Sequence, residues 1–207
     1  MMSQPVAIVD YGMGNLRSVQ NAVAHVGGES VLVLDPEELT AYDKIILPGV
    51  GAFGQAIAFL QQTGLAAGLN ECRDAGAHIL GICLGMQLMC SLSEEDGIHE
   101  GLNWFNAKVM RFLPDMGLSV PHMGWNGVDF VREDPMLAGL ESGNDAYFVH
   151  SYHVVCDDPI DVLATTDYPV KFHCMIQHGN VRGIQFHPEK SQGFGLQIIQ
   201  NYLEMPC

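Results

Sequence analysis

The stretch His78-Ile79-Leu80-Gly81-Ile82-Cys83-Leu84-Gly85-Met86-Gln87 decides the fold of this chain. Its apolar run over 78–82 predicts a buried strand, and the apolar pattern over 84–92 predicts a helix directly behind that strand. Glycines on both sides of Cys83 tolerate the strained backbone of a strand-to-helix turn that exposes the middle side chain. The stretch therefore predicts a nucleophile elbow, whose sulfur lies at a helix N-terminus where unpaired N–H groups stabilise negative charge.

The same alternation of strand and helix fills the chain before this elbow. Apolar runs predict buried strands over 6–10, 31–34 and 45–47. Helical patterns lie between and after them, over 16–26, 53–62 and 65–75. Asn15 is expected to cap the first of these helices. Continuous apolar strands that alternate with helices predict a mostly parallel central sheet with helices on both faces.

From about residue 104 the pattern changes to shorter, alternating runs that are separated by Gly, Pro and Asp. These runs predict added antiparallel strands over 108–113, 127–131, 146–149, 162–166, 172–177 and 181–186. A terminal helix is expected to begin at Ser191. The sequence has no repeats and no long linker, so residues 1–207 are expected to form a single α/β domain.

Composition excludes several classes of function. The 207 residues are 48% hydrophobic, and no segment approaches the roughly 18 consecutive apolar residues of a membrane-spanning helix. A net charge of −15 with only nine Lys and Arg argues against nucleic acid or an anionic membrane as partner. The N-terminal residues lack the basic region of a signal peptide, and the six cysteines form no C-x-x-C pair. We therefore expect a cytoplasmic protein with reduced thiols.

More than a hundred residues after the elbow, the chain reads Gln185-Phe186-His187-Pro188-Glu189. A His two residues before a Glu, on one strand, would place both side chains on the same face. A base and the group that orients it require this arrangement. Cys83 alone could be a buried structural cysteine, and the His-Pro-Glu segment alone could be a polar strand end. Together they predict a nucleophile, a base and an orienting carboxylate in Cys83, His187 and Glu189.

Two other motifs allow different functions. Gly49, Gly51 and Gly54 fit the G-x-G-x-x-G pattern of a dinucleotide-binding loop, but no acidic residue ends a following strand about 20 residues on. The same glycines could instead point backbone N–H groups at an oxyanion near Cys83. The histidine pairs 150/153 and 173/178 suggest zinc, but odd spacing would place strand residues on opposite faces. Histidines that are exposed, or hydrogen-bonded within the fold, fit these positions better.

Residues 81–87, together with 187–189, resemble the class I glutamine amidotransferases, whose glutaminase domain has a flavodoxin-like fold. The stretches 10–15 (DYGMGN), 48–53 (PGVGAF) and 121–126 (PHMGWN) are similar to the glutaminase subunits of imidazole glycerol phosphate synthase, in histidine biosynthesis. A triad glutaminase that serves a different synthase is the nearest alternative. A dinucleotide-binding protein and a catalytically silent interaction subunit are more distant ones.

The resemblance implies a mechanism and a set of site residues. Cys83 would attack the glutamine amide, His187 would carry protons and Glu189 would orient the imidazole, without cofactor or metal. The resemblance assigns the oxyanion to backbone N–H groups of Leu84 and of the Gly49-Val50 strand, which in the family is misoriented at rest. It assigns glutamine binding to four positions, namely Gly51, Gln87, Ser151 and Tyr152.

The resemblance also implies a partner. Ammonia would pass to a (β/α)8-barrel cyclase subunit in a heterodimer, and the cyclase would make imidazole glycerol phosphate and an aminoimidazole carboxamide ribonucleotide. Asn15, Trp125 and Lys190 are expected to face this cyclase, since they lie in or beside the motifs that carry the resemblance. On the alternative interpretation they are a helix cap, a core tryptophan and a solvated lysine, and their replacement would leave binding unchanged.

Overall fold

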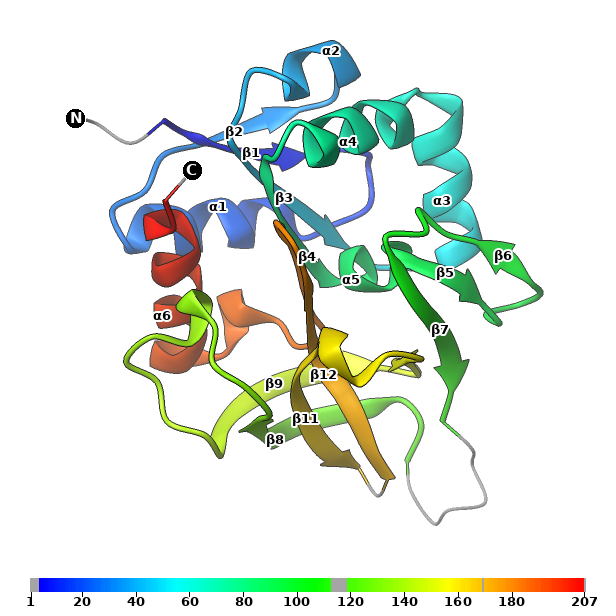
Figure 1. Cartoon of the computed structure of the whole chain (residues 1–207), viewed down its shortest axis with the longest axis vertical. Helices are drawn as coiled ribbons and strands as arrows, with labels where there is room; N and C mark the ends of the chain where they lie inside the picture. Colours follow the sequence, from blue (N-terminus) through cyan, green and yellow to red (C-terminus); the bar gives the residue numbers. More distant parts are fainter. Residues whose placement is uncertain (1–3, 113–118, 169, 207) are drawn as a thin grey trace.

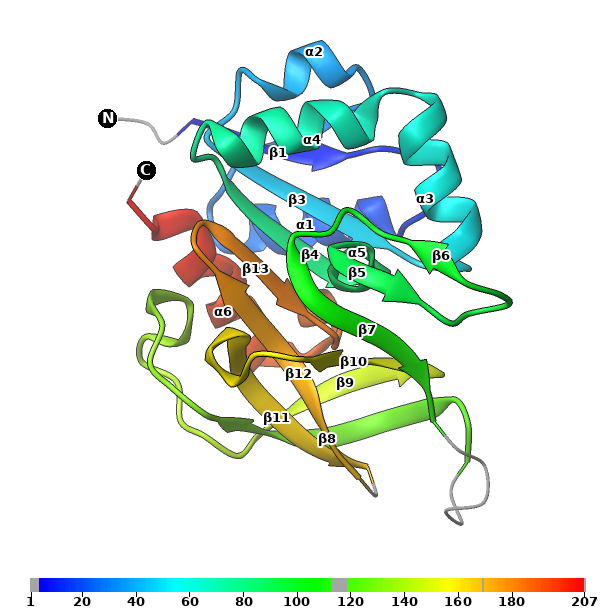
Figure 2. The same ribbon diagram turned by 45° about the vertical axis from the view of Figure 1, so that its right-hand side comes forward.

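A computed structural model describes residues 4–112, 119–168 and 170–206 of the chain. Its centre is a sheet of five parallel strands, which lie side by side in Figures 1 and 2. In spatial order these are β2 (Ser30–Val33), β1 (Val6–Val9), β3 (Lys44–Gly49), β4 (His78–Cys83) and β13 (Val181–Ile184). β1, β3 and β4 are buried apart from the first residues of β3 and β4, as expected from their continuous apolar sequences. β13 is buried along its whole length although it contains Arg182.

Helices cover both faces of this sheet and enclose two hydrophobic cores (Figure 2). On one face lie α3 (Phe53–Gln62), α4 (Leu65–Asp74) and the short α5 (Leu84–Leu88). On the other lie α1 (Leu16–His25) and α6 (Gln192–Glu204), while α2 (Pro36–Leu39) packs against α4. The expected parallel sheet with helices on both faces is therefore present.

Added strands extend the sheet beyond β13. In spatial order these are β12 (Val170–His178), β10 (Tyr152–Cys156), β7 (Phe105–Arg111), β5 (Cys90–Ser93) and β6 (His99–Glu100). A branch from β12 consists of β11 (Val162–Tyr168), β8 (His122–Phe130) and β9 (Asn144–His150). All of these contacts are antiparallel except β5 with β7. Leu113, the last residue of the expected strand 108–113, lies outside the described residues.

The structure corrects four local predictions. The strand expected over 181–186 among the antiparallel additions is β13, which ends at Ile184 and pairs in parallel with β4. The strand expected over 31–34 is an edge strand rather than a buried one, because Val31 and Leu32 are 40% and 39% exposed. The helix expected over 84–92 ends at Leu88, and the chain turns directly into β5. Asn15 stands at the N-cap of α1, but its side chain makes no capping hydrogen bond. An apolar run of this length does not distinguish one short helix followed by a strand from one longer helix.

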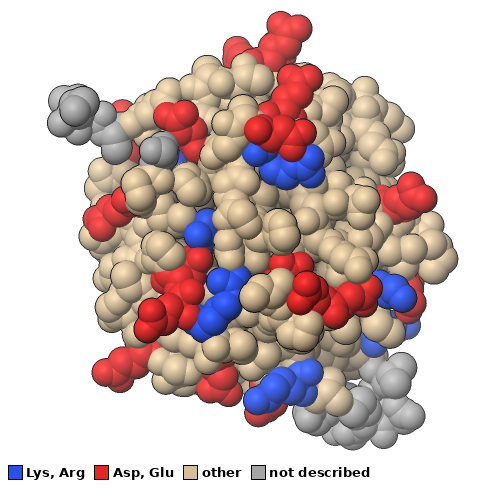
Figure 3. Space-filling model, in the orientation of Figure 1, with Lys and Arg blue, Asp and Glu red and all other residues tan. Residues whose placement is uncertain are grey.

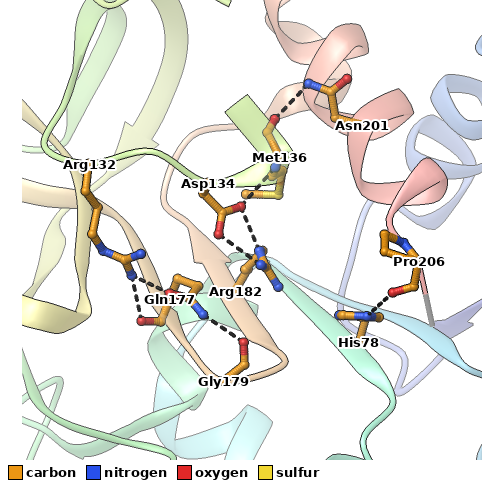
Figure 4. A network of polar contacts seen from close by, with 9 residues as sticks. All are labelled: His78, Arg132, Asp134, Met136, Gln177, Gly179, Arg182, Asn201 and Pro206. Atoms are coloured by element: carbon orange, nitrogen blue, oxygen red, sulfur yellow. Dashed lines mark hydrogen bonds and ion pairs between the residues drawn. The ribbon is translucent and has the colours of Figure 1, made fainter. Parts of the chain in front are cut away.

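A buried ion pair fastens the parallel sheet to the connection between β8 and β9 (Figure 4). Arg182, on β13, donates from Nε and Nη2 to the two carboxylate oxygens of Asp134, each at 2.9 Å. The same carboxylate accepts a bond from the backbone N–H of Met136. The side chains of Arg182 and Asp134 are only 6% and 3% exposed, so removal of either partner would leave a buried charge.

Acidic residues outnumber basic ones in this chain, 24 to nine. On the face in Figure 3 they are scattered over all parts of the structure, and the few basic side chains lie separately among them. This distribution agrees with the net charge of −15 and offers no basic patch on that face. None of the helices in the described residues has the length and apolar character that would be needed to cross a membrane.

Candidate active site

Cys83 occupies a strained turn between β4 and α5. Its backbone has φ 55° and ψ −111°, a conformation that costs energy for any residue with a side chain. The turn ends a buried strand and begins a helix at Leu84, so Cys83 has the position of the nucleophile in an elbow. The thiol is 7% exposed, and it lies on the wall of a cavity.

Close packing explains why glycine follows this turn. A Cβ at Gly85 would overlap the carbonyl oxygen of Leu47 on β3. A Cβ at Gly49 would meet the Tyr11 hydroxyl and the Cβ of Leu84. Any larger residue at either position would push α5 away from the sheet and move Cys83 with it. The glycines therefore set the distance between the nucleophile and β3.

The cavity beside Cys83 has a volume of about 390 Å³. It brings together residues from five separate parts of the sequence, which are Val50, Gly51, Cys83, Leu84, Gln87, Glu95, Val149, His150, Ser151, Tyr152 and His187. A larger cavity of about 750 Å³ lies between residues 130 and 140, and its lining contains neither a cysteine nor a histidine. Only the smaller of these two cavities has a nucleophile and a base on its wall.

His187 lines this cavity, and Glu189 lies behind it in contact with the imidazole. His187 Nδ1 and Glu189 Oε1 are 2.8 Å apart, and both side chains are almost fully buried. His187 Nε2 has no hydrogen-bond partner among the described residues, which leaves it for a reacting group. Burial lowers the pKa of His187, but interactions with Cys83 and Glu189 outweigh burial and raise the pKa well above its ordinary value.

The backbone that pairs His187 with Glu189 differs from the prediction. Strand β13 ends at Ile184, and His187 precedes a 3-10 helix, η4 (Pro188–Lys190), which contains Glu189. A tight turn, rather than the alternation of a strand, brings the carboxylate to the imidazole. Pro188 begins the turn because its fixed φ suits the first helical position.

The glycine-rich loop after β3 lies beside Cys83. Gly49 is in register with Cys83 on the neighbouring parallel strand, and Val50 and Gly51 line the cavity. Leu84 lines it from the other side. The loop therefore belongs to the cavity that contains the cysteine, where its backbone N–H groups can serve an oxyanion.

The four positions that the resemblance assigns to glutamine binding all line the same cavity. Gln87 Nε2 donates to the carbonyl oxygen of Tyr152 at 3.1 Å, which ties α5 to the segment that contains Ser151. Gln87 is 5% exposed, so its amide lies inside the protein and not in solvent.

Sequence reasoning missed three residues around this cavity. Glu95 lines it and accepts a hydrogen bond from the backbone N–H of Phe53 at 2.8 Å. His150 also lines it, and the buried amide of Gln185 lies 3.7 Å from Cys83 Sγ. The Glu94-Glu95-Asp96 run after the expected helix was the only sequence signal for Glu95. Gln185 stood in a quoted motif but had no assigned role.

The histidines of the zinc hypothesis have other partners. His150 and His153 do not lie on opposite faces of one strand, because β9 ends at His150 and β10 begins at Tyr152. Both rings pack on Phe112, with centroids 5.3 and 4.4 Å away. His173 accepts from the backbone of Cys156, and His178 contacts Asp161. Within the described ranges, no three His, Cys, Asp or Glu side chains could hold a metal ion together.

Two of the three expected interface residues lie around Tyr147. Trp125 packs edge-on against Tyr147 with centroids 5.8 Å apart, and Lys190 Nζ lies 5.8 Å from the same ring. Trp125 is 45% exposed, which excludes the interpretation as a core tryptophan. Asn15 lies elsewhere, in the lining of a small cavity behind the triad that also includes Glu189.

Known proteins are similar to this chain in sequence. The model of the family "glutamine amidotransferase class-I" matches residues 7–204. The chain is 48% identical over 200 residues to the imidazole glycerol phosphate synthase subunit HisH of Sulfurimonas denitrificans, covering 95% of this chain and 96% of that protein. Against the HisH subunit of Moorella thermoacetica the identity is 49% over 202 residues, with 98% and 95% covered.

Solved structures share the fold. The structure of PurLQS from Thermotoga maritima superposes with a TM-score of 0.74 at 20% identity, covering 98% of each chain. Another, described as a glutamine amidotransferase, has a TM-score of 0.74 at 19% identity and covers 93% of this chain and 95% of that one. The predicted fold class and the predicted family are both confirmed. The chain belongs to the class-I glutamine amidotransferase family, among the HisH subunits of imidazole glycerol phosphate synthase.

Proposed function

We propose that this chain hydrolyses glutamine to glutamate and ammonia, and that it supplies the ammonia to the cyclase subunit of imidazole glycerol phosphate synthase. One observation carries the proposal: Cys83 and His187 line one cavity, and Glu189 is hydrogen-bonded behind His187. The near 50% identity to HisH subunits supports the choice of synthase. The five described cysteines are free, which supports a reducing cytoplasm as its location.

The first step forms a covalent intermediate. The Cys83 thiolate attacks the side-chain carbonyl carbon of glutamine, and the carbonyl oxygen becomes negatively charged. Backbone N–H groups of Leu84 and Val50 hold this oxyanion, and each such donor typically contributes about 3 kcal/mol. His187 donates its Nε2 proton to the leaving nitrogen, so ammonia departs and a thioester remains. The raised pKa of His187 suits a residue that enters the reaction protonated.

The second step regenerates the enzyme. A water molecule attacks the thioester carbon, and His187 accepts a proton from that water through Nε2. The carbon–sulfur bond breaks, glutamate leaves and Cys83 returns to the thiolate. Glu189 holds the ring through Nδ1 in both steps, which keeps Nε2 directed at the reacting atoms.

The cavity also has groups that suit the rest of glutamine. The Glu95 carboxylate on its wall has the charge to bind the α-ammonium group. Gln87 uses its amide hydrogens on Tyr152 and Gln185, so its carbonyl oxygen is the group left for the substrate. Backbone groups of Gly51, Ser151 and Tyr152 complete the wall.

An exposed apolar surface supports docking of the cyclase. Met123 and Trp125 on β8 are 62% and 45% exposed, and Val50 at the cavity is 42% exposed. Trp and Met are enriched in protein–protein interfaces relative to the rest of a protein surface. Free ammonia would become protonated in neutral water and lose its nucleophilicity, so a partner that covers the exit preserves it. We place Trp125 and Lys190, together with Asn15, at this interface.

Glutamate production tests the function. We expect little turnover by the chain alone and a steep rise when the cyclase subunit and its nucleotide ligand are added. Full activity without the cyclase would instead identify a free-standing glutaminase. If no condition produced glutamate, the catalytic proposal would be wrong. A different synthase as the activating partner would support the nearest alternative.

Replacement of Trp125 tests the interface. We expect Trp125→Ala to weaken cyclase binding at least tenfold, because large aromatic residues contribute most to such surfaces. Titration calorimetry with the cyclase measures the effect. Ile160→Ala is the matched control, since Ile160 is also an exposed apolar residue (66%) but is not in the proposed interface. Equal affinities for the two variants would exclude Trp125 from the interface.

A further inference from the structure

The buried amide of Gln185 contacts the nucleophile from inside the protein and is not among the residues that line the glutamine cavity. Its Nε2 is 3.7 Å from Cys83 Sγ, and its Oε1 is 3.0 Å from Gln87 Nε2. Gln87 Nε2 also reaches the carbonyl oxygen of Tyr152. Gln185 is 0% exposed, and its own backbone N–H is fixed by the carbonyl of Cys174 at 2.8 Å. The three groups form one continuous row of hydrogen bonds that ends at the sulfur.

The direction of these hydrogen bonds follows from the carbonyl at one end. The oxygen of Tyr152 can only accept, so the Gln87 atom facing it must be the NH₂ group. That group has a second hydrogen for Gln185, and the Gln185 atom facing it must therefore be the oxygen. The NH₂ group of Gln185 is then the group that faces Cys83. The structure thus directs a hydrogen-bond donor at the sulfur.

We propose that Gln185 is a further catalytic residue, which donates an N–H hydrogen bond to the Cys83 thiolate and holds it in its reactive form. This inference rests on the proposed function of Cys83 as nucleophile. A thiolate accepts such a bond more strongly than a thiol or a thioester, because the bond to a charged acceptor is the stronger one. The donor therefore stabilises the sulfur before attack and again as the thioester breaks.

The row also connects substrate binding to the nucleophile. Gln87 lines the cavity and holds Gln185 in the orientation that presents its donor to the sulfur. Ser151 and Tyr152 line the same cavity, so the segment that contacts glutamine also fixes Gln87. Because Gln185 lies on the protein side of Cys83, it acts without occupying the space where His187 Nε2 meets the substrate.

Alkylation of Cys83 by iodoacetamide tests the proposal without glutamine turnover. We expect Gln185→Met, which keeps the length of the side chain but lacks the donor, to alkylate about tenfold more slowly at pH 7. Gln185→Glu keeps the shape and places oxygen against the sulfur, so it should be slower still. Mass spectrometry of the peptide that contains Cys83 separates this thiol from the other cysteines. Gln197→Met, on α6, is the control and should keep the wild-type rate.

Glutamine turnover by the complex with the cyclase is a second test of the proposal. We expect kcat of Gln185→Met to fall about tenfold while KM stays within threefold, because the lost bond is to the sulfur and not to glutamine. Wild-type rates of alkylation and turnover in folded Met and Glu variants would overturn the proposal. If the wild-type complex made no glutamate but the alkylation rates still differed, the proposed function would be wrong and the contact would stand.

A measurement on the wild-type protein tests the proposal even if the Gln185 variants do not fold. In the ¹⁵N-labelled protein, ionisation of Cys83 should move the side-chain amide resonance of Gln185 downfield, as expected for a donor that gains a charged acceptor. An amide resonance that does not respond to the ionisation of Cys83 would overturn the proposal.

Discussion

The two halves of this molecule bury their histidines with opposite effects on charge. In the parallel half, which comprises β1–β4, β13 and the helices around them, His187 follows β13, and Cys83 and Glu189 raise its pKa. In the antiparallel half, which comprises β7–β12, burial lowers the pKa of His150 to about 3 and that of His153 to about 4. Burial acts on all three rings, and only His187 has charged partners that outweigh it.

The opposite pKa shifts indicate that the buried histidines have different roles in the two halves. His153 stacks on Phe112 at 4.4 Å, and His122 stacks on Tyr168 at 3.7 Å. Neutral rings pack in this way without the cost of burying a charge. His122 and His150 also share a hydrogen bond of 3.0 Å, in which one of the rings must be the acceptor. The antiparallel half uses histidines as packing groups, and in the proposed mechanism the parallel half uses His187 as a proton carrier.

The largest expected effect separates these roles directly. His187→Gln should reduce glutamine turnover more than about a thousandfold, because it removes the base of the triad. His153→Gln, in the antiparallel half, should stay within threefold of wild type in the same assay with the cyclase. Comparable losses in both variants would contradict the division of roles between the halves.

The next effect concerns the buried ion pair between Arg182 and Asp134, which connects the two halves. Arg182→Met leaves the buried Asp134 without a partner and should lower the free energy of unfolding by about 3 to 5 kcal/mol. Arg73→Met breaks the exposed pair with Asp74 and should cost less than about 1 kcal/mol. Urea unfolding measures both variants. If Arg182→Met cost no more than Arg73→Met, the ion pair would not hold the halves together.

The smallest effect is on the pH dependence of stability. The pKa of His153 is lower in the folded chain than in the unfolded chain, so the unfolded chain takes up a proton first as pH falls below about 6.5. Stability should therefore fall between pH 6.5 and 4. His153→Gln should reduce the loss between pH 6.5 and 5 by about 1 kcal/mol, measured by urea unfolding. An identical loss in both proteins would contradict a neutral His153.

His187 should act with the opposite sign. Its pKa is higher in the folded chain, so its contribution to stability is complete below pH 6.5 and is lost as pH rises through the folded value. His187→Gln should therefore flatten the alkaline side of the stability profile, whereas His153→Gln changes the acidic side.

Most of the parallel half could be predicted from the sequence because β1, β3 and β4 are continuous apolar runs. Cys83, with glycines around it, indicated the elbow for the same local reason. The parallel position of β13 could not be predicted, since Arg182 interrupts its apolar sequence. The edge position of β2 could not be predicted, since Val31 and Leu32 are as apolar as residues of a central strand. Short strands such as β6, with two residues, leave no periodicity to detect.

The site was harder to predict where it depends on long-range contacts. Glu95 and Gln185 join it through β5 and β13, and no local pattern indicates which polar residue a sheet brings to a cavity. His150 and His153 were misassigned to opposite faces of one strand because the break between β9 and β10 at Ser151 is invisible in the spacing. Sequence spacing defines faces only within one uninterrupted strand.

The close approach of Gly49 and Gly85 to their neighbours has a consequence for laboratory evolution. No single substitution at either position fits without moving β3 or α5. In a library of random variants, substitutions at these two positions will therefore abolish activity. The part of the cavity wall that is formed by residues 149–152 and Glu95 contains no glycine and lacks this constraint. Selection for a different amide substrate would reshape that wall and leave the nucleophile unchanged.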